Sequence, residues 1–469
     1  MNPVDRFFEI TARKSTLGTE IRGGVVTFIA MAYIIVLNPI ILSSSADVEG
    51  NELDFAAVSA STSLAAGVMT ILFGVIARLP FALAAGLGLN SFLATTVVGV
   101  LTWPEAMGLV VINGVIIVLL AVTGLRRMVF EAVPMQLKLA ITAGIGLFIL
   151  FIGLVDSGFI QSTGVPSPPV GLGSGGLGSI TTIPTLVFVV TVLLTGILVA
   201  RKVPGGILIG LVAGTVVAVV IEAIWHLGPA TEKAGGWSLS VPALSGSPFA
   251  MPDLSLVGDV SFSGFGRIGV LAMVMLVFTL VFANFFDAMG TMTGLSQDTR
   301  IAAKDGTFPR LRSALVVEGA GAVVGGATSS SSTTVFIESG AGIQEGARTG
   351  LANVVTGVLF LAAMFVSPLA SVVPTEVAAA ALVVVGAMMI SHIRHVDLSE
   401  LSVALPVVLT VAVMPFSYSI ANGIGVGFIS WAVMRTAVGK AREVSPLLWI
   451  VAAGFAVYFA RAPLESLIG

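Results

Sequence analysis

Apolar residues gather into long runs along this chain, and short polar segments separate the runs. A bilayer core of about 30 Å needs about 20 apolar residues per helix. Fourteen runs have the length or character of membrane segments: 21–43, 55–77, 81–100, 104–123, 134–155, 181–200, 204–226, 268–290, 311–327, 331–343, 349–371, 374–391, 400–418 and 420–437. A fifteenth apolar run, 446–461, is left unassigned, since it could span, lie flat or re-enter. The pattern predicts an all-α polytopic membrane protein.

Composition supports this class and excludes several kinds of chemistry. The chain is 56% hydrophobic and only 10% charged, whereas soluble domains carry about 25% charged residues. Cysteine is absent, which excludes disulfides, thiolate metal sites and cysteine catalysis. The three histidines, at 226, 392 and 395, lie at segment ends and form no metal-binding pattern. With a net charge of −3 and scattered basic residues, we expect no nucleic-acid partner. From the missing cysteines and the scattered histidines we also expect no cofactor, no metal and no enzyme activity.

Basic residues predict the orientation of the chain in the membrane. If the N-terminus is cytoplasmic and the chain crosses at each predicted span, 19 of the 22 Lys and Arg residues lie inside, only Lys233 and Arg267 lie outside, and Arg461 is unassigned. Such a bias is what the positive-inside rule describes. We therefore expect a multi-pass protein of the cell inner membrane, with a cytoplasmic N-terminus whose residues 3–12 form a short surface helix.

Two predicted spans, 81–100 and 331–343, are unlike ordinary membrane helices. Each has a few strand-compatible residues, then glycines and a polar residue, then a helix-compatible tail. They are the third and tenth spans, and therefore the third of each half if the chain is two units of seven. Short, glycine-interrupted segments at matching places in two halves indicate a transporter's binding site. Because seven is odd, the second unit must be inverted relative to the first.

The candidate site centres on two acids, Asp287 and Glu338. Asp287 ends the apolar run 270–290, and Glu338 lies in the polar run of span ten. A carboxylate inside a membrane segment costs about 2.5–3.5 kcal/mol on insertion scales, so it usually faces protein or water and has a function there. The alternative is an interfacial acid at a helix end, satisfied by a neighbouring amide. Because burial disfavours the charged form, either acid could also take up and release the coupling proton.

Two carboxylates and an amide suit a planar heterocycle with alternating donors and acceptors. Asn90, in span three, could bond another edge of such a ring, or it could cap the start of a glycine-rich helix. Ile337 and Ser339 flank Glu338 and join the predicted site, although Ser339 could serve only the unwound backbone. Thr291, one turn after Asp287, could line the same cavity or bond its own helix.

Further residues have mainly structural interpretations at this stage. Tyr33 could stack on a ligand, but helix packing is the favoured interpretation. The Asn38–Pro39 pair is expected to end or kink the first span. Three more acids near span ends are expected to be interfacial: Glu131, Glu222 and Glu318.

At these residues the chain resembles the nucleobase–cation symporter 2 fold, in the AzgA-like branch of adenine/guanine/hypoxanthine permeases. The stretches that carry the resemblance are TFIAMAYIIVLNP (27–39), AAGLGLNSF (84–92), FANFFDAMGT (282–291), SSTTVFIESGAG (331–342) and MPFSYSIANGIGVGF (414–428). The resemblance implies two inverted seven-segment repeats, with spans 1–4 and 8–11 as a core domain, spans 5–7 and 12–14 as a gate domain, and short strands in spans 3 and 10. It also implies that Asp287, Glu338 and Asn90 bind substrate. The uracil and xanthine branches usually have glutamate at the position of Asp287, so the shorter side chain favours the purine branch.

The expected organisation is an amphipathic N-terminus (1–20), core (21–130), gate (131–230), an extracytoplasmic loop (231–267), core (268–371), and gate with the C-terminal apolar segment (372–469). The expected function is proton-coupled import of adenine, guanine or hypoxanthine. The expected partners are a purine nucleobase and the lipid bilayer, with a homodimer left open. The alternatives are a related-fold transporter of uracil, xanthine or an anion, a membrane-embedded enzyme, and a channel.

Overall fold

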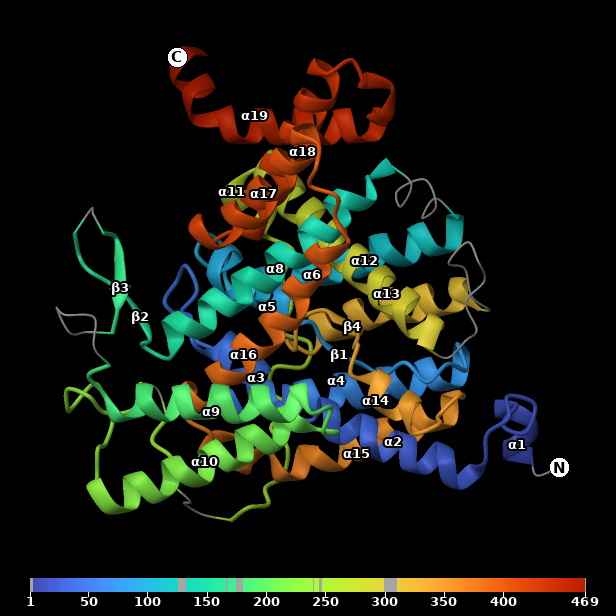
Figure 1. The fold of residues 1–469 in the computed structure, drawn as a ribbon, viewed down its shortest axis with the longest axis vertical. Coiled ribbons are helices and arrows are strands. Elements are labelled where there is room, and N and C mark those ends of the chain that lie inside the picture. Colours follow the sequence, from blue (N-terminus) through green and yellow to red (C-terminus); the bar gives the residue numbers. More distant parts are fainter. Residues whose placement is uncertain are drawn as a thin grey trace.

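The structure, a computed structural model, describes residues 3–124, 132–165, 168–173, 180–238, 240–243, 247–298 and 310–468. Within these residues most of the chain is helical, and the long helices lie side by side across the view of Figure 1. The first half of the chain contains α1 (Pro3–Phe8), α2 (Leu17–Met31), α3 (Ile34–Ser43), α4 (Phe55–Ile76), α5 (Leu87–Phe92), a π-helical turn (Leu93–Val97), α6 (Trp103–Thr123), α8 (Met135–Asp156), α9 (Ile183–Ala200) and α10 (Gly206–Trp225). The second half contains α11 (Gly264–Ile268), α12 (Val270–Asp298), α13 (Leu311–Ala327), α14 (Ser339–Gln344), α15 (Gly350–Ala363), α16 (Thr375–Ile390), α17 (Leu401–Phe416), α18 (Ile420–Ala437) and α19 (Pro446–Ile468), with 3₁₀ turns at Met364–Val372, Ser391–His395 and Ala441–Glu443.

Two short strands from the two halves of the chain meet near the centre of the molecule (Figure 1). Strand β1 (Leu83–Ala85) pairs antiparallel with β4 (Thr333–Val335), and Ala84 faces Thr334. The ladder continues past both ends, through Gly86 N–H to Ser332 O (2.9 Å) and Phe336 N–H to Ala82 O (3.0 Å). This pairing satisfies backbone groups that the broken helices leave free, as membrane depth requires. The prediction of short strands within 81–100 and 331–343 is confirmed. A second pair, β2 (Ile160–Ser162) and β3 (Val170–Leu172), forms a separate hairpin.

The helices around β1 and β4 form one packed group, which we call the strand bundle: α2–α6 and α12–α15. Within it α4 packs along α15, and α6 packs along α13. Both contacts use glycine to bring backbones together, a common device in membrane helix packing. A Cβ on Gly350 would overlap the Gly74 carbonyl oxygen, and one on Gly114 would lie 2.5 Å from the backbone nitrogen of Val323.

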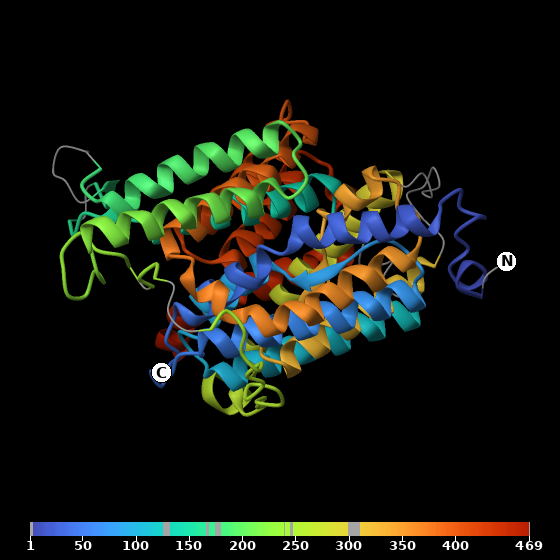
Figure 2. The same ribbon diagram turned by 90° about the horizontal axis from the view of Figure 1, so that it is seen from below.

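A second group, the outer bundle, consists of α8–α10 and α16–α18. Here α8 packs against α16 and α17, α9 against α10 and α16, and α17 against α18. In Figures 1 and 2 the green helices α9 and α10 lie at the edge of the molecule. The two bundles contact each other through α8 with α5 and α12, and also through the pairs α10–α2, α16–α3 and α18–α12.

Two segments differ from what the sequence predicts, and a third, left unassigned from the sequence, is a helix. The first predicted span is interrupted at Ala32–Tyr33, between α2 and α3, and not at Asn38–Pro39, because Pro39 is accommodated inside α3. The N-terminal helix ends at Phe8, four residues early, because Glu9 takes a left-handed backbone conformation (φ 63°). The unassigned run 446–461 becomes helix α19, which packs against α18 and α12 and lies at the top edge of Figure 1.

Of the helices in the described ranges, nine are long and apolar enough to cross a membrane. The protein is therefore a multi-pass membrane protein. Several other predicted spans consist of shorter pieces: the third span is β1, α5 and the π-helical turn, and the tenth is β4 and α14.

Candidate functional site

Glu338 lies just beyond β4, at the residue before α14, where the broken tenth segment changes from strand to helix. Its side chain is half-buried. The Tyr33 hydroxyl donates a hydrogen bond of 2.6 Å to Glu338 Oε1. Tyr33 occupies the break between α2 and α3 and is only 1% exposed. One carboxylate oxygen of Glu338 is therefore held by a fixed donor, which leaves the other oxygen for a ligand.

Asp287 lies on α12 and is also half-buried. Its carboxyl group is close enough to those of Glu338 and Glu318 to interact electrostatically with both. Thr291 follows one turn later on the same helix and is likewise half-buried. The structure thus brings together the two acids that the sequence singled out, from segments 51 residues apart in the chain.

Asn90 does not cap the start of α5. That position belongs to Gly86, which makes no side-chain cap bond. Instead, the fully buried Asn90 Nδ2 donates to Asn38 Oδ1, and Asn38 Nδ2 donates in turn to Thr62 Oγ1 (2.7 Å) and Ser330 O (3.0 Å). Within the described part of the chain, Asn90 Oδ1 has no hydrogen-bond donor. This chain of amides ties α5 to the loop before β4 and leaves one acceptor unused.

The two neighbours of Glu338 differ in character. Ser339 is fully buried, and its Oγ accepts a 2.9 Å hydrogen bond from the Ala82 N–H, which adds a link between the two broken segments. A hydroxyl that accepts one bond still has its own proton to donate. Ile337 is 47% exposed, whereas Phe336 before it is buried and Glu338 after it is half-buried. It therefore offers apolar surface beside the Glu338 carboxylate.

Sequence reasoning missed two residues. The packing interpretation of Tyr33 does not include its hydrogen bond to Glu338, because no local pattern reveals a partner 305 positions away. The expectation that Glu318 is interfacial is wrong. It is 0% exposed on α13, packed among helices, and within the described residues neither of its carboxyl oxygens has a hydrogen-bond partner. Position near a predicted span end was misleading, because α6 covers this part of α13. Glu131 lies outside the described residues.

Among the described residues, no group of three or more His, Asp or Glu side chains is placed to hold a metal ion. The grouping is instead two acids, a buried tyrosine, amides and hydroxyls around a strand crossing. Such groups can accept and donate hydrogen bonds at the edge of a flat polar ligand.

Comparison with known proteins agrees with this description. Residues 18–426 match a family model described as "Permease family". The chain is 38% identical over 459 residues to the guanine/hypoxanthine permease PbuG of Bacillus subtilis (strain 168), covering 97% of this chain and 98% of that protein. It is 34% identical over 452 residues to the adenine permease AdeP of Escherichia coli (strain K12), covering 96% and 94%.

Solved structures show the same fold at low sequence identity. The transmembrane domain of a cyanobacterial bicarbonate transporter, BicA, superposes with a TM-score of 0.59 at 17% identity, covering 90% of this chain and 97% of that domain. The anion transporter SLC26A9 of mouse gives 0.59 at 12% identity, covering 91% of this chain and 69% of that one. The family match and the full-length relatives go further than the fold. The chain belongs to the permease family of the nucleobase–cation symporter 2 type, and it is a membrane transporter rather than an enzyme.

Proposed function

We propose that this protein imports purine nucleobases (adenine, guanine or hypoxanthine) across the cytoplasmic membrane by proton symport. The observation that carries the proposal is the Glu338 carboxylate at the strand crossing, with one oxygen held by Tyr33 and with Asp287 nearby. A purine edge presents N–H donors, which a carboxylate accepts well. The relatives named as guanine/hypoxanthine and adenine permeases support the same substrate class.

Each residue of the proposed site has a distinct role. Glu338 accepts ring N–H groups, and Asp287 helps to bind the base and carries the coupling proton. Asn90 uses its unpaired Oδ1 to read another edge of the ring. Ile337 supplies apolar surface to the ring face, and the hydroxyls of Thr291 and Ser339 complete the set.

The proposed architecture is fourteen membrane segments in two inverted repeats, with the N-terminus in the cytoplasm. In such a repeat each segment corresponds to the one seven places later. The observed helix contacts support this correspondence. The shift by seven segments converts the pair α4–α15 into the pair α13–α6, and the pair α8–α17 into the pair α16–α9. All four pairs are in contact. The strand bundle then corresponds to the core domain and the outer bundle to the gate. An epitope tag within 247–263 should be accessible from outside, and one within 391–399 only from inside; both tags on one side would contradict the topology.

The coupling mechanism has its own test. Collapse of the proton gradient by a protonophore should abolish accumulation of purine, whereas full uptake after collapse, or strict dependence on sodium, would rule out proton symport. Asp287→Asn should lose the pH dependence of transport while keeping measurable binding of purine. The matched control is Asp253→Asn, which changes an exposed acid in the loop between α10 and α11 (the outer loop). It should leave both properties unchanged.

The substrate class is tested by competition of labelled hypoxanthine uptake with adenine, guanine, xanthine and uracil. Purines of the proposed class should compete at concentrations far below those of uracil. The solved structures of the same fold make an anion such as bicarbonate a second candidate. Two acids at the site disfavour it by repulsion. Competition by bicarbonate or sulfate, with no effect of purines, would overturn the proposal.

A further inference from the structure

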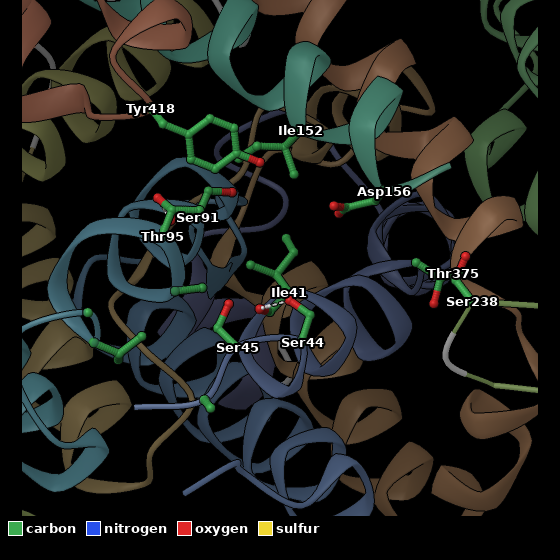
Figure 3. A pocket seen from close by; sticks show the side chains of 14 residues that line it. Ile41, Ser44, Ser45, Ser91, Thr95, Ile152, Asp156, Ser238, Thr375 and Tyr418 are labelled. Atoms are coloured by element: carbon green, nitrogen blue, oxygen red, sulfur yellow. Dashed lines mark hydrogen bonds between the residues drawn. The ribbon is translucent and has the colours of Figure 1, made fainter. Parts of the chain in front are cut away.

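A cavity of about 580 Å³ lies between the strand bundle and the outer bundle, and its lining does not include Glu338 or Asp287. The strand bundle contributes the end of α3 and the segment from α5 through the π-helical turn. The outer bundle contributes α8, the start of α16 and the loop between α17 and α18. Figure 3 shows Tyr418, Ile152 and Asp156 from the outer bundle facing Ser44, Ser45, Ser91 and Thr95 from the strand bundle. Its volume lies within the range of about 300–1,000 Å³ that small-molecule sites occupy.

Asp156 gives this cavity a carboxylate that the fold itself does not require. It is the last residue of α8, where the negative end of the helix dipole disfavours an acid. Among the residues that the structure describes, none donates a hydrogen bond to its side chain. An acid in an unfavourable position, without a partner, on the wall of a cavity is available to a ligand that brings N–H donors.

Tyr418 supplies an aromatic wall held in a fixed position. Its ring makes edge contacts with Phe148 (5.6 Å between centroids, 77°) and Phe151 (6.0 Å, 73°). Its backbone has φ 52°, in the left-handed region. Such a conformation is strained for a bulky residue and tends to occur at functional positions.

The opposite wall supplies hydroxyl groups. Ser91 is fully buried, and within the described residues its Oγ has no hydrogen-bond partner. It follows Asn90 directly on α5. Asn90 bonds Asn38 within the strand bundle, whereas Ser91 lines the cavity (Figure 3). One short helix thus presents neighbouring residues to the proposed central site and to this cavity.

One turn back along α5, the two bundles touch. A Cβ on Gly88 would lie only 2.5 Å from Ile145 Cγ2 on α8. This contact precedes Ser91 on α5 and Ile152 on α8, and the bundles touch again beyond it, where Thr96 Oγ1 donates to the Tyr418 carbonyl oxygen (3.4 Å). A ligand in the cavity would therefore contact both bundles at once.

We propose that this cavity is an outer binding site that captures a neutral purine base before the base reaches Glu338. The proposal rests on the proposed function for its substrate class. Asp156 accepts ring N–H groups, the Tyr418 ring contacts the face of the base, and Ser91 and Thr95 bond its polar edge. In its ionised form the same carboxylate repels anionic heterocycles, so the outer site favours neutral bases.

The absence of cysteine from the chain allows a direct test. Thr95→Cys introduces the sole thiol, at the cavity wall, and a membrane-impermeant maleimide should label it in intact cells. Saturating hypoxanthine should slow the labelling. Ser255→Cys, in the exposed outer loop, should be labelled at the same rate with and without the base. Labelling of Thr95→Cys only after permeabilisation would overturn the proposal.

A second measurement separates the outer site from the central one. In Thr95→Cys combined with Glu338→Gln, transport should be lost but hypoxanthine should still slow labelling. Asp156→Asn should raise the KM for uptake at least about tenfold with little change in maximal rate, as expected for loss of a hydrogen bond to a charged group; Asp253→Asn is its control. If the parent transports purines but protection disappears with Glu338→Gln and Asp156→Asn keeps the parent KM, the outer site is wrong and the proposed function stands. If the parent takes up no purine, the proposed function itself fails.

Discussion

Tyr33 should determine which way a glutamine at position 338 faces, and this gives a sharp test of the central site. In the parent, the Tyr33 hydroxyl donates to Glu338 Oε1 at 2.6 Å. In Glu338→Gln only one side-chain atom can accept that proton. The amide oxygen should therefore turn toward Tyr33 and the NH₂ group toward the ligand. The reverse orientation would leave the buried Tyr33 proton without an acceptor, which is costly.

The expected loss of binding affinity in Glu338→Gln follows from this orientation. A ring N–H that met a carboxylate oxygen now meets an NH₂ donor. Losing a hydrogen bond to a charged group and leaving a buried donor unpaired costs about 1.5–3 kcal/mol, or roughly 10- to 150-fold in affinity. Tyr33→Phe alone removes the donor that positions the carboxylate but keeps both acceptor oxygens, so it should weaken binding by a smaller factor.

In the Glu338→Gln background, Tyr33→Phe should change the binding affinity in the opposite direction from its effect in the parent. Without the Tyr33 hydroxyl, the glutamine can rotate and present its oxygen to the base. Tyr33→Phe should therefore improve binding in the Glu338→Gln background, although it weakens binding in the parent. The assay is calorimetry with hypoxanthine on purified, monodisperse protein of all four variants. A double variant weaker than Glu338→Gln would refute the orienting role of Tyr33, and a folded Glu338→Gln with parental affinity would show that the base binds elsewhere.

Two further predictions concern stability, each measured by thermal unfolding in detergent. The hydrogen bond from Lys440, with others from Ser402 and Arg435, lowers the pKa of Glu400 to about 2 from its ordinary 4.5. The ionised Glu400 side chain therefore contributes fully to folding stability above pH 4.5, and this contribution is lost as pH falls toward 2. The parent should thus unfold at a higher temperature than Glu400→Gln at pH 6, and the difference should shrink below pH 4.5; a constant difference would contradict the ion-pair account. Gly350→Ala places a methyl group against the Gly74 carbonyl and should destabilise the protein by about 1–3 kcal/mol or more. The control is Gly18→Ala, which has open space around it and should be nearly neutral. Equal effects of the two substitutions on the unfolding temperature would argue against the close α4–α15 contact.

Hydrophobic length and interruption determined much of this molecule before any contact was known. The membrane class follows from long apolar runs, because a helix without water must be apolar over the thickness of the bilayer. The breaks in the segments 81–100 and 331–343 were predictable for a similar reason, whereas short strands there were implied by the family resemblance. Glycines and polar residues at matching places in the two halves cannot continue a membrane helix, so the backbone must find partners elsewhere. Asp287 and Glu338 were conspicuous because acids are rare at this depth.

The partners of these residues were decided only by the tertiary structure. Glu338 meets Tyr33 across 305 positions, and Asn90 meets Asn38 across 52. Local periodicity describes the face on which a side chain lies, but not which distant segment covers that face. The same limit explains Glu318, whose burial depends on the packing of α13 against α6, and run 446–461, whose packing on α12 and α18 fixes it as helix α19. The cavity at Asp156 and Tyr418 also exists only in the tertiary structure, because its walls come from two bundles, each continuous in packing but not in sequence.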